Sequence, residues 1–334
     1  MSIKIAINGF GRIGRCAARI ITKREGVELV AVNDTSRRDM TKNLLKYDSV
    51  HGKFSEKVEL LEDDFVQIGD QKVKFFSDRD PNNLEFAKYG ADVVLECTGA
   101  ILTQEKAIAH INRGVKKVVF SAPAKDDTPT FVMGVNNHQY RGESIISNAS
   151  CTTNALAPVV KLLDETYGIK KGLMTTIHSY TNDQNLLDVK HKKDLRRARA
   201  AAVNIIPTTT GAAKAIGLVL PELQGKLQGL ALRVPTPNVS MIDLSVVVDK
   251  KVTTDELKEL FINASKDKYR GYIGIDEDKL VSSDFNGESV SSVVPLDLLQ
   301  VVDDNLVKVM SWYDNEWGYS ERLVDMAVYV CKEG

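Results

Sequence analysis

The sequence predicts an α/β protein whose first half forms a doubly wound parallel sheet. A short β-branched run at residues 3–7 is followed by a glycine turn and then by a segment with helical periodicity, and strands and helices continue to alternate after it. The chain has 334 residues, more than one hydrophobic core usually organises. We therefore expect two domains of about 150 residues each.

The composition is that of an ordinary globular enzyme, with 43% hydrophobic and 27% charged residues. A formal net charge of -1 gives no field that attracts polyanions, so we expect neither nucleic acid nor a membrane as principal partner. No export or membrane-spanning segment is expected, because charges interrupt every long apolar stretch. The four cysteines form no C-x-x-C pair, which argues against a disulfide framework or a metal site and favours a reducing cytosol.

The glycine turn reads N-G-F-G-R-I-G at residues 8–14. Between a strand and a helix, this pattern predicts a Rossmann-type dinucleotide site. Gly9 allows the tight turn, Gly11 lets the backbone approach a pyrophosphate, and Gly14 lets the helix pack closely on the strand. The alternative is a glycine turn that joins any strand to any helix.

A second strand, at residues 27–32, leads to Asp34, about 20 residues beyond the glycines. Its carboxylate would accept hydrogen bonds from the adenosine ribose and repel a 2′-phosphate, which favours NAD over NADP. Arg37 and Arg38 leave NADP open, because two guanidinium groups turned inward would accommodate that phosphate.

Further parallel strands are expected at residues 93–96 and 118–121, with a helix at 103–112 between them. Ligands bind at the carboxyl ends of such strands, which makes Thr98, Gly99 and Ser121 neighbours of the cofactor. Arg79 is ambiguous between the adenine edge and a surface loop.

Cys151 lies where an apolar run gives way to a predicted helix through residues 155–163. At the N-terminus of that helix, unpaired N–H groups and the macrodipole would lower the pKa of the thiol and stabilise an oxyanion. Pro158 leaves the start of the helix uncertain by a few residues. We interpret Cys151 as the nucleophile and the other three cysteines as buried small hydrophobes.

His178 follows a predicted strand and precedes a polar loop, from which an imidazole would reach the thiol of Cys151. We interpret it as the base of the cysteine and the other four histidines as structural or solvated.

Phosphate recognition is predicted from two features. A basic run at residues 196–199 precedes a Thr-Gly turn at Thr210 and Gly211, and both suit an anion. A solvated helix face is the alternative for the arginines. Arg233 interrupts an apolar strand, where a charge usually needs a partner.

Seven segments spread over the whole chain resemble signatures of the phosphorylating glyceraldehyde-3-phosphate dehydrogenases. They are N-G-F-G-R-I-G at 8–14, L-K-Y-D-S-V-H-G at 45–52, S-N-A-S-C-T-T-N at 147–154, I-I-P-T-T-T-G-A-A-K-A at 205–215, R-V-P-T-P-N-V-S at 233–240, D-F-N-G at 284–287 and S-W-Y-D-N-E-W-G-Y-S at 311–320.

The resemblance implies roles for individual residues. Two anion subsites, for the substrate phosphate and for inorganic phosphate, would be lined by Ser150, Cys151, Thr152, Thr181, Arg197, Thr210, Gly211 and Arg233. Contacts with NAD are implied for Arg12, Ile13, Asp34, Arg79, Ser121 and Asn315, with Tyr319 packed beside Asn315. Arg196 stays an alternative to Arg197, because the length of this loop varies in the family.

The implied activity is glycolytic and gluconeogenic: glyceraldehyde 3-phosphate, NAD and inorganic phosphate would give 1,3-bisphosphoglycerate and NADH through a thiohemiacetal and a thioester on Cys151. An erythrose-4-phosphate dehydrogenase, with water as acyl acceptor, is the enzymatic alternative. A non-catalytic module that senses NAD is the alternative of another class.

The resemblance also implies the organisation of the chain. We expect a Rossmann domain at residues 1–150 and a catalytic α/β domain with a mostly antiparallel sheet at 151–316. A helix at 317–334, apolar at helical spacing between residues 324 and 330, would return to the first domain. A cytoplasmic homotetramer is implied as well.

Overall fold

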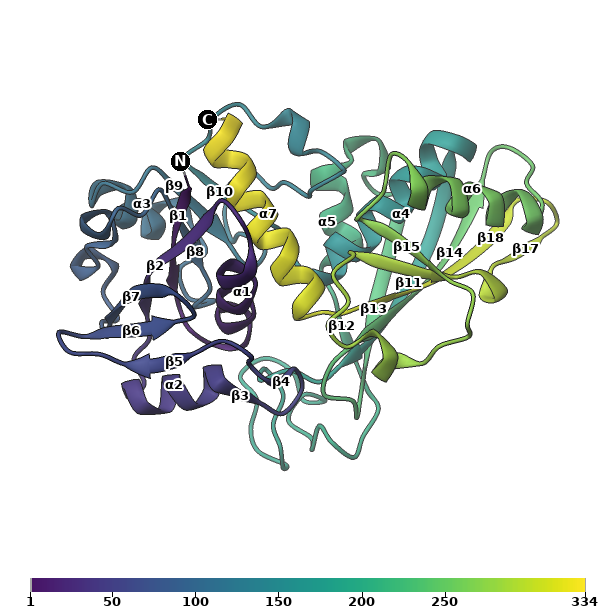
Figure 1. Ribbon diagram of the computed structural model, residues 1–334. Helices are drawn as coiled ribbons and strands as arrows, with labels where there is room; N and C mark the ends of the chain where they lie inside the picture. Colours follow the sequence, from purple (N-terminus) through teal and green to yellow (C-terminus); the bar gives the residue numbers. More distant parts are fainter. Residues whose placement is uncertain (1, 334) are drawn as a thin grey trace. The chain divides into compact units, whose positions relative to one another are not determined.

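The computed structural model describes residues 2–333, which fold into two compact units (Figure 1). The first unit comprises the chain up to Ser150 together with the segment from Ser320 onward, and the second unit runs from Cys151 to Tyr319. Within the described residues, no helix has the length and apolar character needed to cross a bilayer.

The first unit is built on an eight-stranded sheet in the order β10-β9-β8-β1-β2-β7-β6-β5. Its strands are β1 (Ile3–Asn8), β2 (Val27–Asn33), β5 (Val58–Leu60), β6 (Phe65–Ile68), β7 (Gln71–Phe76), β8 (Val93–Glu96), β9 (Lys117–Phe120) and β10 (Ile145–Ser147). The six strands from β10 to β7 are parallel. Figure 1 shows β1 between β2 and β8, the position at which the strand order reverses and at which ligands bind in such sheets. The predicted doubly wound sheet is thereby confirmed.

The far edge of this sheet differs from a purely parallel arrangement, because β5, β6 and β7 pair antiparallel. Only Gly69 and Asp70 connect β6 with β7, and Gly69 has a φ of 58°. A two-residue connection can join only antiparallel neighbours, whereas a parallel crossover needs a dozen residues or more.

Four helices and a small hairpin complete the first unit: α1 (Arg12–Lys23), α2 (Arg38–Lys46), α3 (Gln104–Asn112), α7 (Trp317–Glu333), β3 (Tyr47–Asp48) and β4 (Gly52–Lys53). Helix α3 is capped by Thr103, whose side chain accepts from the N–H of Lys106. Helix α7 begins at the end of the second unit, and its residues from Ser320 belong to the first. There Asp325 pairs with Arg24, the residue after α1, and Tyr329 packs edge-on against Tyr140.

The second unit has a seven-strand sheet in the order β12-β13-β11-β14-β18-β16-β15, with β17 added on β18. The strands are β11 (Ile169–Ser179), β12 (Ile206–Thr209), β13 (Leu227–Val234), β14 (Ser240–Val248), β15 (Ile273–Asp276), β16 (Ser292–Pro295), β17 (Gln300–Val302) and β18 (Leu306–Tyr313). Only the β11–β13 and β15–β16 pairs are parallel, which confirms the mostly antiparallel sheet.

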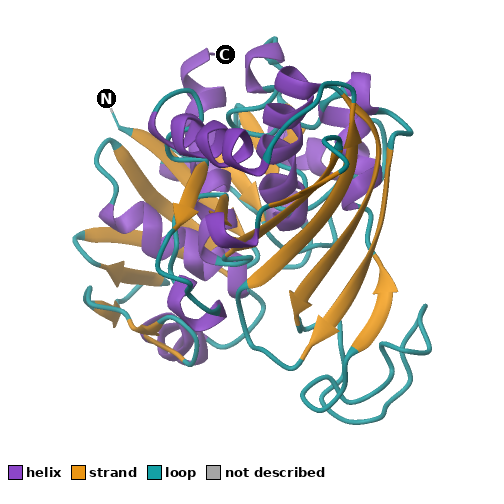
Figure 2. Cartoon of the chain, turned by 90° about the vertical axis from the view of Figure 1, so that its right-hand side faces the viewer, coloured by secondary structure: helices purple, strands orange, loops and turns teal. Residues whose placement is uncertain are grey.

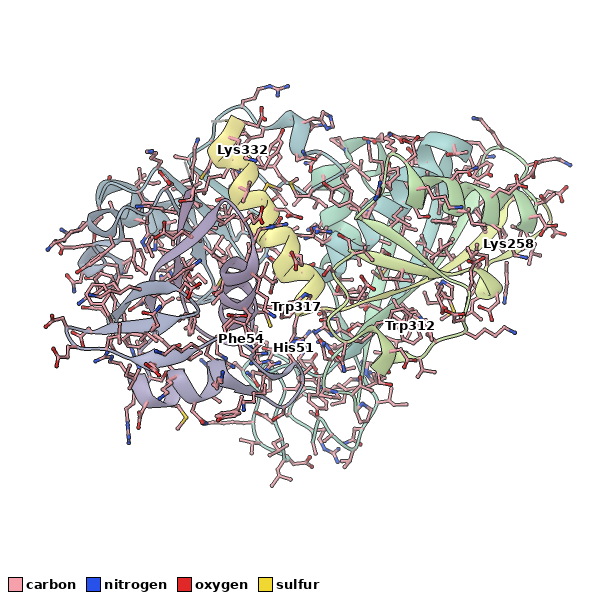
Figure 3. All side chains as sticks on the ribbon, in the orientation of Figure 1. His51, Phe54, Lys258, Trp312, Trp317 and Lys332 are labelled. Atoms are coloured by element: carbon pink, nitrogen blue, oxygen red, sulfur yellow. The ribbon has the colours of Figure 1, made fainter. Side chains whose placement is uncertain are left out.

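One face of this sheet is covered by helices, and its strands are the long ones in Figure 2. The helices are α4 (Cys151–Tyr167), α5 (Ala212–Val219) and α6 (Thr254–Lys266). Along β11 the side chains of Met174, Thr176 and His178 are buried, whereas Leu173 is 68% exposed on the opposite face. In the same unit Trp312, labelled in Figure 3, stacks on Phe285 with ring centroids 5.5 Å apart.

Candidate active site

The glycine turn of the first unit connects β1 to α1 without room for side chains at two positions. Gly9 has a φ of 94°, and a Cβ added there would lie 2.6 Å from the backbone nitrogen of Thr98. A Cβ at Gly14 would lie 2.2 Å from the carbonyl oxygen of Gly9. Gly11 is different, because nothing lies within 4 Å of its added Cβ. The turn is therefore close-packed on the protein side and open at Gly11, a cradle that fits the approach of a pyrophosphate.

A pocket of about 470 Å³ opens at this turn, within the first unit. Its walls are formed by Asn8, Gly9, Phe10, Gly11, Asn33, Asp34, Thr35, Asp78, Arg79, Cys97, Thr98, Ala100 and Ile101. Five residues predicted at or beside the cofactor thus share one cavity, namely Gly9, Gly11, Asp34, Arg79 and Thr98. Asp34 is half-buried there and accepts from the backbone N–H of Ser36 at 2.7 Å.

The two arginines that left NADP open both have partners. Arg37 Nε donates to Asp39 at 3.1 Å, and the Arg38 guanidinium donates to the carbonyl oxygens of Leu61 and Phe65 at 2.8 and 2.7 Å. Neither side chain lines the pocket. This arrangement favours the unphosphorylated ribose of NAD.

The remaining predicted cofactor residues of the first unit lie near the same strand ends. Arg12, the first residue of α1, pairs with Asp48, and Ile13 follows it half-buried. Burial acts to raise the pKa of Asp48, but the hydrogen bonds from Arg12 and from two backbone N–H groups outweigh it and hold that pKa at about 2. Ser121 directly follows β9, and its N–H donates to the carbonyl of Glu96 at 3.0 Å.

Cys151 is the first residue of α4, which continues through Pro158 to Tyr167. The helix therefore begins four residues earlier than the predicted segment. Residues 152–160 are all buried, and this packing on every side compensates for the N–H that a proline lacks. Ala149, two residues before Cys151, has a φ of 57°, a left-handed conformation that is rare outside glycine.

His178, near the end of β11, faces Cys151 inside the second unit. Its Nε2 lies 3.6 Å from Cys151 Sγ, and its Nδ1 lies 2.7 Å from the carbonyl oxygen of Ser179. A proton on Nδ1 would donate to that carbonyl and leave Nε2 as the acceptor toward the thiol, the tautomer that a general base requires, whereas a hydrogen bond from Arg233 Nη1, 2.8 Å from Nδ1, requires the proton to be on Nε2.

Arg233 stands beside His178 because β11 and β13 are parallel and pair these two residues in register. Arg233 Nη1 lies 2.8 Å from His178 Nδ1 and donates to the Ser179 carbonyl at 2.9 Å. Thr152, also predicted at the anion site, has a buried hydroxyl that hydrogen-bonds the hydroxyl of Tyr313 at 3.0 Å.

The three groups influence one another's protonation. Burial, together with the positive charge of Arg233, lowers the pKa of His178 to about 3. Burial also raises the pKa of the Cys151 thiol, against the opposite effect of Arg233. Desolvation of the thiolate outweighs the backbone N–H groups of Cys151 and Thr152, which do act to lower that pKa at the helix N-terminus, so the expected net lowering does not occur in the free chain. The pair rests as a thiol and a neutral imidazole.

Of the two adjacent arginines in the basic run, Arg197 is the one held in place. Its Nε donates to Thr208 Oγ1 at 2.9 Å, its Nη2 donates to the Thr209 carbonyl at 3.2 Å, and its Nη1 pairs with Asp183. Arg196 is exposed.

The other predicted residues of the second unit differ in their surroundings. Gly211 is exposed directly before α5 with nothing within 4 Å of an added Cβ, and Thr210 Oγ1 accepts from the N–H of Ala212 at 3.2 Å. Thr181 is half-buried two residues after β11. Ser150, half-buried, is the last residue of the first unit before Cys151.

Asn315 is buried, and its Oδ1 accepts from Ser179 Oγ at 2.9 Å and from Ser240 Oγ at 2.8 Å. In this orientation Nδ2 lies on the other side of the amide, as a donor for a ligand. Tyr319 is 4% exposed, and its N–H donates to the carbonyl of Asp314 at 3.4 Å.

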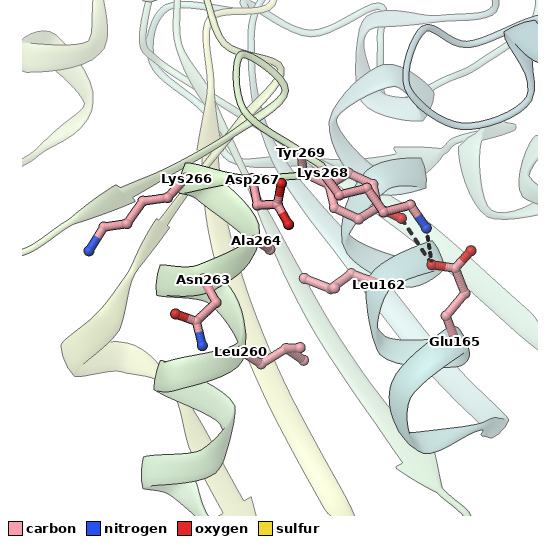
Figure 4. Close-up of a pocket in the computed structure, with 9 residues that line it drawn as sticks. All are labelled: Leu162, Glu165, Leu260, Asn263, Ala264, Lys266, Asp267, Lys268 and Tyr269. Atoms are coloured by element: carbon pink, nitrogen blue, oxygen red, sulfur yellow. Dashed lines mark hydrogen bonds and ion pairs between the residues drawn. The ribbon is translucent and has the colours of Figure 1, made fainter.

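A second cavity, of about 440 Å³, lies between α4 and α6 and contains none of the predicted site residues (Figure 4). Its lining includes the apolar side chains of Leu162, Leu260 and Ala264, and Lys268 and Tyr269 both contact Glu165, at 2.7 and 3.3 Å (Figure 4). Its lining carries no acid–base pair like that of Cys151 and His178.

Several functional neighbours escaped sequence reasoning. Tyr313, Thr208 and Ser240 hold Thr152, Arg197 and Asn315 in place, and Glu96 lies beneath the dinucleotide pocket. For Glu96 a signal existed, since a carboxylate at the end of an apolar strand needs buried partners.

Comparison with known proteins agrees with the division into a nucleotide-binding unit and a unit that contains Cys151 and His178. Residues 3–104 match the model described as "Glyceraldehyde 3-phosphate dehydrogenase, NAD binding domain", and residues 150–315 match its C-terminal domain. The chain is 52% identical to glyceraldehyde-3-phosphate dehydrogenase 2 of Nostoc sp., over 99% of each chain. It is 51% identical to glyceraldehyde-3-phosphate dehydrogenase of Geobacillus stearothermophilus over the full length of both. It is 52% identical to the chloroplastic enzyme A of Zea mays, over 97% of this chain and 81% of that one.

Proposed function

The chain belongs to the glyceraldehyde-3-phosphate dehydrogenase family, and from this premise we propose that it oxidises and phosphorylates glyceraldehyde 3-phosphate with NAD and inorganic phosphate. The contact of 3.6 Å between Cys151 Sγ and His178 Nε2 carries the proposal. It pairs a nucleophile with a base, which covalent catalysis needs and a sensor of NAD does not.

Cys151 attacks the aldehyde carbon, and its proton passes to His178 Nε2 as the carbon–sulfur bond forms. The N–H groups of the first turn of α4 stabilise the developing oxyanion. NAD held at the pocket lined by Gly9, Gly11 and Asp34 would supply the hydride acceptor for oxidation of the thiohemiacetal, which leaves a thioester on Cys151. Inorganic phosphate then attacks the acyl carbon, and the thiolate leaves to give 1,3-bisphosphoglycerate.

The shifted pKa values shape the first step. In the free chain the proton stays on the thiol, because the pKa of His178 is near 3 and that of Cys151 is raised. A phosphate group bound at Arg233 offsets the charge that depresses the pKa of His178. Substrate binding therefore makes the base stronger at the moment at which it is needed.

Arginines and backbone donors form the two proposed anion subsites. Arg233 and Arg197 supply the positive charges, and Ser150, Thr152, Thr181, Thr210 and Gly211 surround them in our assignment. Arg197 is preferred to Arg196 because three partners already orient its guanidinium. Asn315, Tyr319, Arg12, Ile13 and Ser121 complete the proposed contacts with NAD.

A homotetramer is proposed from the open face of the second-unit sheet. Leu173 on β11, Leu230 on β13 and Leu306 on β18 are 68%, 45% and 40% exposed. Apolar side chains exposed on a sheet are usually covered by a partner, here a second copy of the chain. Light scattering tests this proposal, since the wild type should have the mass of a homotetramer and Leu173→Lys a lower mass. The same mass for the wild type and the variant would argue against it.

The cytoplasm is the compartment that we propose, since the four cysteines are free thiols.

The proposed activity is tested by NADH formation from glyceraldehyde 3-phosphate, with and without inorganic phosphate. Turnover that requires phosphate supports the proposal. Turnover with erythrose 4-phosphate that is independent of phosphate indicates the related dehydrogenase, and NAD binding without turnover indicates a sensor.

A further inference from the structure

Three buried polar residues stand in a row at the carboxyl edge of the first-unit sheet. Asn8, Asn33 and Glu96 are the last residues of β1, β2 and β8, and the sheet register places Asn8 between the other two. Their exposed fractions are 2%, 4% and 0%. Asn8 and Asn33 line the dinucleotide pocket, whereas Glu96 lies behind its wall.

Hydrogen bonds run along this row in one direction. Asn33 Nδ2 donates to Asn8 Oδ1 at 2.7 Å, and Asn8 Nδ2 donates to Glu96 Oε2 at 2.6 Å. At the other end, Asn33 Oδ1 accepts from the N–H of Asp78 at 3.0 Å, and Asn33 Nδ2 also donates to the Asp78 carbonyl at 2.8 Å.

The direction follows from the carboxylate. An ionised carboxylate only accepts, so the Asn8 amide must turn its NH₂ toward Glu96 and its oxygen toward Asn33. Asn33 must then turn its NH₂ toward Asn8, which leaves its oxygen for Asp78. One carboxylate thus orients two amides and holds the loop that carries Asp78 and Arg79.

The second oxygen of Glu96 holds Thr98, another residue that lines the dinucleotide pocket. Glu96 Oε1 accepts from the backbone N–H of Thr98 at 2.9 Å and from its hydroxyl. Thr98 is the residue against which Gly9 packs without room for a Cβ. His110 stacks on Phe86, and its Nε2 lies 3.4 Å from Glu96 Oε2.

A buried carboxylate below a site for an anionic cofactor is electrostatically unfavourable unless it serves another purpose. We propose that Glu96 is the positioning residue of the dinucleotide pocket, which fixes the orientation of the Asn8 and Asn33 amides and holds Thr98 against the glycine turn. This inference rests on the NAD binding that follows from the family.

The test compares NAD affinity in Glu96→Gln and in Asp92→Asn, both made in the full chain. Glutamine presents an NH₂ group to which Asn8 or Thr98 cannot donate, so the row loses its single direction. Asp92 is the matched control, because it precedes the same strand at the other end and accepts there from the N–H of Lys4 and from Lys116.

We expect Glu96→Gln to raise the dissociation constants of NAD and of ADP-ribose by about 10-fold or more, and Asp92→Asn to change them by less than about twofold. The KM for NAD should rise with the kcat at saturating NAD retained. Alkylation of Cys151 by iodoacetamide should keep its wild-type rate, which a globally damaged fold would not allow.

Wild-type affinity for NAD in Glu96→Gln would overturn the inference, and so would an equal loss in Asp92→Asn. If Glu96→Gln does not fold, Thr98→Val decides, since it removes the hydroxyl donor and keeps the N–H; an unchanged NAD affinity then rejects the inference. A wild-type chain that fails to bind NAD would reject the proposed function instead.

Discussion

Buried ionisable groups are treated differently in the two units. In the first, Glu96 is fully buried but both of its oxygens accept hydrogen bonds, and Asp48 keeps its charge through Arg12. In the second, burial shifts the pKa values of His178, Cys151 and Arg233 toward the uncharged forms of all three. The geometry of a binding site can be fixed by hydrogen bonds to every polar atom of a buried group. A reaction site instead contains buried groups whose pKa values are shifted and whose charges are balanced only when a substrate binds.

The largest difference between the effect on catalysis in the second unit and the effect on NAD binding in the first is expected from Cys151→Ser. Turnover should fall by about 10⁴-fold or more, because a serine hydroxyl beside a weakly basic imidazole is a poor nucleophile. NAD affinity should be retained, since the pocket lies in the first unit. NADH absorbance and calorimetry measure the two effects, with Cys331→Ser as the control cysteine. Substantial turnover in Cys151→Ser would contradict the assignment.

His178→Asn should have the next largest effect, a loss of about 10²- to 10⁴-fold in kcat, the usual contribution of a proton-transfer group. His138→Asn, at an exposed histidine of the first unit, should keep wild-type kcat. Equal rates for the two variants would remove His178 from the mechanism.

Acid should destabilise the protein partly through His178. Its pKa is about 3 in the folded chain against 6.5 as the ordinary value, so the unfolded chain binds a proton first as the pH falls. The associated stability is complete above pH 6.5 and is lost between there and about pH 3, at about 1.4 kcal/mol per pH unit. Urea unfolding measured from about pH 7 to about pH 4 covers most of the interval between these two pKa values. The free energy of unfolding should fall less steeply with decreasing pH in His178→Asn than in the wild type. Parallel curves would exclude this effect.

The smallest effect is expected at the cofactor edge of the first unit. Arg37→Ala should change the ratio of kcat/KM for NAD and NADP by less than about twofold, because Arg37 already pairs with Asp39. Asp34→Asn, in contrast, should increase the use of NADP, since it removes the charge that repels a 2′-phosphate. A large change in Arg37→Ala would show that this side chain leaves Asp39 when a cofactor binds.

Local patterns predicted the fold more closely than the site. The strand at residues 93–96 was predicted at its observed bounds, and the helix at 103–112 differs only in Thr103, which caps it. Apolar runs and turn residues act over short distances and can be read directly. The β5–β7 edge departed from the parallel prediction because a two-residue turn dictates its direction.

Which residues meet in the site depends on the register between paired strands, and no local sequence pattern determines that register. Arg233 meets His178 across 55 residues because two strands align, and Glu96 meets Asn8 across 88 residues for the same reason. The pKa of Cys151 was misjudged because the helix N-terminus is visible in the sequence and the burial of the thiol is not.

The discontinuity of the first unit has a consequence for biosynthesis. Asp325 pairs with Arg24 across 301 residues, so the nucleotide-binding unit is completed by a segment that is synthesised after the whole second unit. The second unit is continuous in sequence and is fully synthesised before that segment emerges. The N-terminal part must therefore wait with an incomplete surface while its neighbour folds, which makes nascent chains vulnerable to aggregation and gives chaperones a defined interval in which to act.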